Sequence, residues 1–220
     1  KASKEVLTAD PWAKYYTWDA FKTRLIDFDP YLRRLIADNE ERQPEEFYVR
    51  PVTLDGEDLE RRLTKWLRSD DCQPMAILAT YGMGKTTFAN HLAAELAKRC
   101  LAGAIERIPI LLRLGDLVAE QDLDGLLGKL FTRTYQVRNF RYDVFKQLND
   151  DGHLLIIADG FDEMKRSVDA HQMRHNFEQL YGLCKGQAKF LLLGRPTVFL
   201  TDEEKTFFLK GGVTLGQEIE

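Results

Sequence analysis

A glycine-containing loop at residues 79–87, ATYGMGKTT, contains the residue types that bind phosphate groups. It follows an apolar run and precedes a helical pattern, so free backbone N–H groups and a helix N-terminus would face a bound anion. Gly82 and Gly84 can adopt positive φ and let phosphate approach the main chain. Lys85 would reach the β- and γ-phosphates, and the Thr86 hydroxyl would reach Mg²⁺. This pattern predicts a phosphate-binding (Walker A) loop.

One position of this loop departs from the usual pattern G-x-x-x-x-G-K-S/T, because Ala79 occupies the place of the first glycine. Alanine is tolerated there if the backbone angles are ordinary, and costs about 1–2 kcal/mol if the residue must be left-handed. We therefore expect a weakened loop at worst. The predicted nucleotide contacts come from Tyr81, Gly82, Met83, Gly84, Lys85, Thr86 and Thr87.

A second group of chemically capable residues ends the apolar run in LLIIADGFDEM. Asp159 would lie at the carboxyl end of a buried strand, where α/β sheets present side chains to a ligand. Its predicted role is to hold Mg²⁺, since magnesium takes a few carboxylates together with phosphate oxygens. Either Asp162 or Glu163 could polarise a water for attack on the γ-phosphate.

A third candidate is Arg195, which directly follows the apolar run in KFLLLGRP. A guanidinium at this point could reach the γ-phosphate as a fixed positive charge. An arginine after a strand is usually a surface residue, so we predict this role for Arg195 only because the two motifs upstream are present.

The elements that must position these residues follow a strand-helix alternation. Apolar runs without polar alternation predict strands buried on both faces, at residues 75–80, 108–114, 153–160 and 189–194. Helical patterns lie between them, after Lys85, over 122–131 and over 168–185. The fold class predicted is α/β, a three-layer P-loop NTPase with a central, mostly parallel sheet.

A short helical segment precedes this domain. Residues 18–28 place aromatic and apolar side chains at helical spacing, and Asp29 with Pro30 begins a second helix. Leu59, Leu63 and Trp66 mark a further helix, for which we predict Asp55 as the N-cap. We expect a helical lead-in at 1–46 and a nucleotide-binding domain at 47–220.

Composition adds constraints on the class of protein. The 220 residues carry a formal net charge of −4, so no strong field favours nucleic acid or an anionic membrane. No apolar run is long enough to span a bilayer, and we expect no membrane association. The three cysteines have no paired spacing, which indicates a reducing compartment and predicts a cytoplasmic protein.

The three motifs together resemble those of a known family. ATYGMGKTT, LLIIADGFDE and KFLLLGRP are similar to the signature motifs of the NACHT nucleotide-binding domain, in the family's order. The most specific match is DGFDE at 159–163. NACHT domains belong to the signal-transduction (STAND) ATPases, which act as switches in innate immunity, programmed cell death and bacterial anti-phage defence.

The resemblance implies ATP/ADP and Mg²⁺ as cofactors. Thr86 and Asp159 would hold the metal, Asp162 or Glu163 would serve hydrolysis, and Arg195 would be the sensor arginine. Ala79 and the pair Leu193-Gly194, which stands where many members carry hydroxyls, both bear on the rate of hydrolysis more than on binding. The implied activity is Mg²⁺-dependent ATP hydrolysis with low turnover.

The resemblance also implies partners. The chain would form a homo-oligomer when activated and would work with effector, winged-helix and sensor domains of the full-length protein; the C-terminal helical and winged-helix parts are expected to be absent here. By analogy with the segment before the loop in family members, Tyr48, Val49 and Pro51 would contact adenine.

Two other functions compete with a switch. A ring-forming remodelling or motor ATPase acting on nucleic acid or protein would want a second arginine that reaches a neighbouring subunit, and the sequence offers no clear candidate. A small-molecule kinase shares the loop but seldom needs D-G-x-D-E. Residues 131–146 interleave arginines with aromatics as single-strand binders do, yet core packing explains the aromatics better and nucleic acid is not expected.

Overall fold

The computed structural model describes residues 25–42, 48–103, 107–117, 122–167, 170–196 and 213–214. Within these ranges, parallel strands form one sheet in the order β2-β3-β4-β1-β5. The strands are β1 (Met75–Leu78), β2 (Ile108–Arg113), β3 (Leu154–Asp159), β4 (Lys189–Gly194) and β5 (Val213–Thr214). The predicted α/β class is confirmed. Trp18 and Phe21 of the predicted first helix lie outside the described residues.

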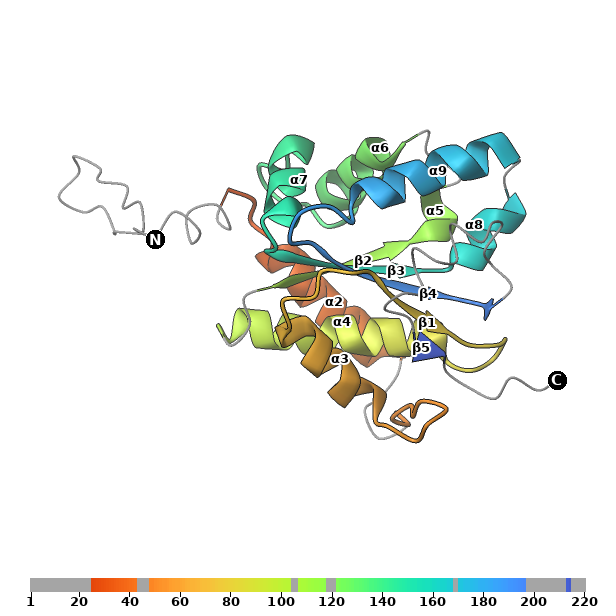
Figure 1. Ribbon diagram of the computed structural model, residues 1–220. Coiled ribbons are helices and arrows are strands. Elements are labelled where there is room, and N and C mark those ends of the chain that lie inside the picture. Colours follow the sequence, from red (N-terminus) through yellow and green to blue (C-terminus); the bar gives the residue numbers. More distant parts are fainter. Residues whose placement is uncertain are drawn as a thin grey trace.

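Helices cover both faces of this sheet (Figure 1). On one face lie α2 (Asp29–Arg42), α3 (Leu59–Arg68) and α4 (Lys85–Leu101). On the other lie α6 (Leu123–Gly128), α7 (Tyr142–Asp150) and α9 (Ala170–Gly182), with α5 (Leu114–Leu117) and α8 (Phe161–Ser167) at the carboxyl ends of the strands. A π-helical turn, η2 (Lys129–Thr134), continues α6.

The central strands are apolar because both of their faces are covered. Every residue of β1, β3 and β4 is buried, and the sequences MAIL, LLIIAD and KFLLLG are correspondingly continuous rather than alternating. The predicted strands 75–80, 108–114 and 153–160 were one or two residues too long, with the excess at the strand ends.

The position of β4 decides which loops are neighbours. β4 lies between β1 and β3, with Ile77 in register with Leu193 and Ile157 in register with Leu191. Because all three strands run in the same direction, their carboxyl ends meet at one edge. The loop after β4 therefore emerges between the phosphate-binding loop and the end of β3.

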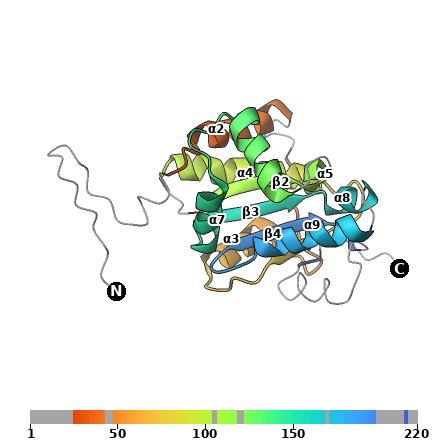
Figure 2. The ribbon, with the colours of Figure 1, turned by 90° about the horizontal axis from the view of Figure 1, so that it is seen from above.

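Helix α2 packs beside α4 at the β2 edge of the sheet (Figure 2). Tyr31 of α2 is fully buried, and its hydroxyl accepts a hydrogen bond of 2.7 Å from the backbone N–H of Leu111 in β2. Its ring lies edge-on to Phe131, 5.1 Å away. The lead-in helix thus contributes to the domain core, while the predicted boundary at 46/47 lies outside the described residues.

The aromatic residues of segment 131–146 pack inward. Phe131 and Phe145 are fully buried, and Tyr135 and Phe140 pack against the same core. The prediction that these aromatics serve core packing is confirmed. The helix α7 within this segment was not predicted.

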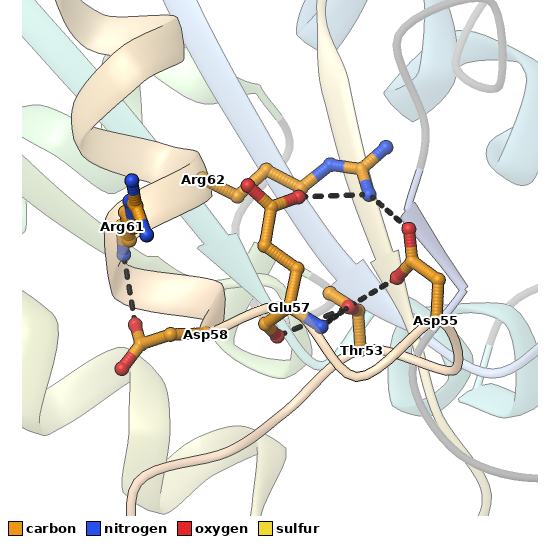
Figure 3. Close-up of polar contacts among 6 residues, drawn as sticks. All are labelled: Thr53, Asp55, Glu57, Asp58, Arg61 and Arg62. Atoms are coloured by element: carbon orange, nitrogen blue, oxygen red, sulfur yellow. Dashed lines mark hydrogen bonds and ion pairs between the residues drawn. The ribbon is translucent and has the colours of Figure 1, made fainter.

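The start of α3 differs from the prediction. Asp58, not Asp55, is the N-cap, and its carboxylate accepts a hydrogen bond of 2.9 Å from the N–H of Arg61 (Figure 3). Asp55 lies in the preceding turn, where it contacts the Thr53 hydroxyl and pairs with Arg62 at 3.4 Å. A turn that satisfies its own polar groups thus displaces the helix start by three residues.

In the described part of the chain, no helix is long and apolar enough to cross a membrane.

Candidate nucleotide-binding site

The predicted phosphate-binding loop connects β1 to α4 at the carboxyl edge of the sheet. Gly82 and Gly84 have φ angles of 79° and 73°, and a Cβ at either position would meet nothing within 4 Å. Gly84 is the N-cap residue, and α4 begins at Lys85, as predicted. A loop of left-handed glycines that leads into a helix N-terminus leaves backbone N–H groups available to an anion.

Ala79 has an ordinary backbone conformation. Among the described residues, the only non-glycine positions with positive φ are Gln136 and Asn139. The N–H of Ala79 donates a 3.0 Å hydrogen bond to the Gly194 carbonyl, which extends the β1–β4 pairing, and its methyl group is buried. The substitution of the first glycine therefore carries none of the strain that a left-handed alanine would.

The Lys85 side chain bonds to the main chain of the loop. Its Nζ donates to the carbonyl oxygens of Ala79 at 2.7 Å and Thr80 at 2.8 Å. Burial lowers the pKa of the Lys85 ammonium. The negative charges of Asp162 and Asp159 oppose this shift, and the positive charge of Arg195 adds to it. All three motifs therefore lie within electrostatic reach of this one side chain.

Asp159 and Thr86 form an oxygen-donor pair at the base of the site. Asp159 is 5% exposed at the end of β3, and the Thr86 side chain hydrogen-bonds to its carboxylate. Burial raises the pKa of Asp159, and Glu163 adds to that effect, while Thr86 and Arg113 oppose it. A carboxylate and a hydroxyl are hard oxygen donors, so these residues fit Mg²⁺, which completes its coordination with phosphate oxygens and water.

The two acidic residues after Gly160 point to different partners. Asp162 Oδ2 lies 2.7 Å from Arg195 Nε, in a contact that is electrostatic rather than a well-aligned hydrogen bond. The Arg195 guanidinium also lies over the ring of Tyr81, 5.4 Å from its centroid. Arg195 therefore links the end of β4 to α8 and to the phosphate-binding loop.

Glu163 lies on the other side of α8, toward α5. Its Oε2 would be 3.1 Å from a Cβ at Gly115 and 3.4 Å from a Cβ at Gly160. Both Asp162 and Glu163 belong to the first turn of α8, where the helix dipole favours negative charge.

Arg113 is a site residue that the sequence reasoning missed. It is the last residue of β2, in register with Asp159, and its Nη2 donates to Asn90 Oδ1 of α4 at 2.9 Å. Its charge lowers the pKa of Asp159, against the larger effect of burial. A single arginine near the end of the otherwise apolar predicted strand 108–114 was the available signal.

The three adenine candidates do not form one surface. Tyr48 stacks on His91 with ring centroids 3.5 Å apart, and its hydroxyl donates to Glu60 Oε1 at 2.9 Å. It lines a cavity of about 340 Å³ between α3 and α4. Val49 is 83% exposed and Pro51 is half-buried, and neither lines this cavity.

The loop residues that remain are solvent-accessible. Tyr81 is 84% exposed and Met83 is 54% exposed, while Thr86 is exposed and Thr87 is half-buried at the start of α4. In the described part of the chain, no group of three or more His, Cys, Asp or Glu side chains could hold a metal ion by itself.

Comparison with known proteins agrees with this geometry. A sequence model of the NACHT domain matches residues 73–203, which include the loop, Asp159 and Arg195. The chain belongs to the NACHT family. As a NACHT domain it is a P-loop NTPase of the nucleotide-binding ATPase class, and the resemblance drawn from the motifs is confirmed.

Two further comparisons gave a match, one with a longer protein and one with a solved structure. An uncharacterized WD repeat-containing protein of Nostoc sp. (strain PCC 7120) is 30% identical over an alignment of 208 residues, with coverage of 84% of this chain and 14% of that protein. This NACHT domain thus spans about one seventh of that relative's length. The structure of C. elegans PCH-2 aligns with 90% of this chain and 43% of its own, with 13% identity and a TM-score of 0.39.

Proposed function

We propose that this NACHT domain is an ATP/ADP-dependent molecular switch that hydrolyses ATP slowly. The observation that carries the proposal is the ion pair of Arg195 with Asp162, 2.7 Å apart, which joins the second and third motifs beside the phosphate-binding loop. A γ-phosphate would offer Arg195 a stronger anionic partner. A ligand that changes such a contact between two states can shift an equilibrium between them.

Each loop residue has a proposed part in binding. Gly82 and Gly84 let the phosphates approach the backbone, and Lys85 exchanges the carbonyl oxygens of Ala79 and Thr80 for phosphate oxygens. Thr86 and Asp159 hold Mg²⁺, which would neutralise charge on the β- and γ-phosphates. Tyr81, Met83 and Thr87 border the bound phosphates.

We assign different roles to the two acids of α8. Asp162 is committed to Arg195, so we propose it as the residue that positions the arginine. Glu163 lies toward α5 and is close enough for its charge to raise the pKa of Asp159. We therefore propose Glu163 as the group that orients the attacking water.

Adenine contacts remain part of the proposal. Tyr48, Val49 and Pro51 precede α3, and the Tyr48 ring is held on α4 through its stack with His91. We propose Tyr48 as the main contributor among the three, since its ring is half-buried and fixed by the Glu60 hydrogen bond.

The output of the switch would be nucleotide-dependent homo-oligomerisation, controlled together with other domains of a longer protein, in a defence setting such as innate immunity or anti-phage immunity. The family membership supports this proposal, as does the WD repeat-containing relative, of which this chain covers a small part. A cytoplasmic location would suit it.

The test measures binding of fluorescent ATP and ADP with Mg²⁺ to the wild type and to Lys85→Ala, with Lys98→Ala on the same helix as a matched control. Phosphate release is followed in the same samples. We expect binding by the wild type and by Lys98→Ala, loss in Lys85→Ala, and turnover far below one per minute. Failure of the wild type to bind nucleotide would overturn the proposal.

A second readout separates a switch from a motor. The mass of the wild type in solution is measured with ATP and with ADP. A switch would assemble with one nucleotide and disassemble with the other. Rapid steady-state turnover without any nucleotide-dependent change in mass would favour a remodelling ATPase.

A further inference from the structure

The Glu163 carboxylate lies in a space bounded by two glycines. Gly115 belongs to α5, directly after β2, and Gly160 directly follows β3. A Cβ at Gly115 would lie 3.1 Å from Glu163 Oε2 and 3.8 Å from Glu163 Cβ. A Cβ at Gly160 would lie 3.4 Å from the same oxygen. The ends of two neighbouring strands thus leave room for one carboxylate.

Glycine is favoured at these two positions for different physical reasons. Gly160 has a φ of 83°, so its backbone conformation alone favours glycine. Gly115 has no left-handed φ and lies within a helical turn, where alanine would be the better residue for the backbone. The backbone does not explain glycine at 115, whereas the contact with Glu163 does.

We propose that Gly115 is a positioning residue for Glu163. The lack of a side chain at 115 allows the carboxylate to lie against α5, between the ends of β2 and β3. A methyl group at 115 would be closer to Oε2 than ordinary van der Waals contact. The carboxylate, at the end of an exposed side chain, would have to shift by a few tenths of an ångström. For a group that orients a reacting water, a shift of this size takes up much of the roughly half an ångström that catalytic geometry tolerates. This inference rests on the proposed hydrolytic role of Glu163.

The contact can be tested without nucleotide. Thermal unfolding is measured for the wild type, Gly115→Ala, Glu163→Ala and the double variant. We expect Gly115→Ala to raise the unfolding midpoint more in the Glu163→Ala background than in the wild type, because the crowded side chain is gone. Gly128→Ala in α6, where a Cβ meets nothing within 4 Å, is the matched control and should be additive with Glu163→Ala. Additivity of Gly115→Ala with Glu163→Ala would overturn the proposal.

The functional consequence is tested by single-turnover hydrolysis, with the protein in excess over ATP and with Mg²⁺. We expect Gly115→Ala to slow phosphate release by roughly threefold while ATP affinity changes less than twofold. Gly128→Ala should match the wild type. Glu163→Asp, whose carboxylate is withdrawn from position 115, should lose less activity in the Gly115→Ala background than in the wild type. A merely structural effect of alanine at 115 would not produce this rescue.

The experimental outcomes distinguish failure of the proposed function from failure of the proposed role of Gly115. A wild type that binds no nucleotide would overturn the proposed function, while the unfolding measurements would still report on the contact. A wild type that binds ATP but never releases phosphate would overturn the role of Glu163 and, with it, that of Gly115. Equal rates for Gly115→Ala and the wild type would overturn the role of Gly115 alone.

Discussion

Arg195 Nε lies 2.7 Å from Asp162 Oδ2, which joins the residue after β4 to the first turn of α8. The same guanidinium stacks over Tyr81 of the phosphate-binding loop. Both side chains of the pair are mostly buried, with 25% exposure for Arg195 and 13% for Asp162. The pair is therefore a defined structural contact whose partner a γ-phosphate could replace.

Replacement of Arg195 should separate ATP from ADP. In Arg195→Ala we expect ATP affinity to fall by about 2 kcal/mol, or roughly thirtyfold, because a charge-assisted contact to the γ-phosphate is lost. ADP affinity should change little. Titration calorimetry with each nucleotide checks this, with the exposed Arg174→Ala of α9 as control. An equal loss for both nucleotides would contradict a γ-phosphate contact.

Replacement of Asp162 should have the opposite effect on ATP. Asp162→Asn keeps the shape of the side chain but removes its charge, so stability without nucleotide should fall by about 1 kcal/mol. The stabilisation by ATP should increase, since Arg195 no longer has a competing anion. Thermal shifts with and without ATP check both expectations. In an Arg195→Ala background the same substitution should leave ATP affinity unchanged.

Introducing the usual glycine at position 79 should not increase ATP affinity. Ala79 has ordinary backbone angles and a buried methyl group, so Ala79→Gly removes apolar contact and adds freedom to the unfolded chain. We expect a loss of about 1 kcal/mol in the free energy of unfolding and unchanged ATP affinity. Urea unfolding and nucleotide titration measure the two effects. A clear gain in ATP affinity would show that alanine strains the loop.

Lys189 is a buried cation at the amino end of β4. Its Nζ donates to the carbonyl oxygens of Trp66 at 2.8 Å and Ser69 at 3.0 Å, and also contacts that of Asp71. It thereby satisfies carbonyl groups at the end of α3. Lys189→Met removes this shared donor, although the Trp66 carbonyl keeps its hydrogen bonds from the Ser69 N–H and hydroxyl. We expect a loss of about 1–2 kcal/mol in the free energy of unfolding.

Lys185→Met is the matched control, because Lys185 is exposed in the turn before β4. It should change stability by less than about 0.5 kcal/mol. Urea unfolding of both variants measures the difference. Similar values for the two would mean that the Lys189 contacts contribute nothing net.

The hydroxyl of Tyr31 completes the hydrogen bonding of the outermost strand. Tyr31→Phe leaves the N–H of Leu111 buried without its acceptor, which costs about 1–3 kcal/mol. Hydrogen exchange should accelerate at Leu111 more than at Ile156 in β3. Tyr142→Phe, from the same aromatic cluster, should change neither stability nor exchange. Unchanged exchange at Leu111 in Tyr31→Phe would show that water replaces the hydroxyl.

The chemistry of the site was predictable from local patterns. Phosphate binding uses consecutive backbone groups, so Gly82, Gly84 and Lys85 identify the loop wherever the fold places it. The acids after the apolar run 153–160 were likewise recognisable, because a buried strand that ends in carboxylates is a local feature. The class of the sheet followed from apolar runs that lack alternation.

The arrangement of strands depended on tertiary structure. The sequence of a parallel strand does not identify the strands beside it, so the place of β4 between β1 and β3 could not be inferred from its sequence. That place is what brings Arg195 against Asp162 and leaves Glu163 beside Gly115. The different contacts of the two acids could not be inferred from their adjacent positions in DGFDE.

Local sequence patterns were thus enough to name the residues that we propose for phosphate and metal binding, since these proposals depend on residue type and on contacts within a few positions. Tertiary structure decided which of them meet. It brought Arg195 against Asp162, because β4 lies between β1 and β3. It also placed Arg113 beside Asp159, because strand register alone aligns residues 46 positions apart.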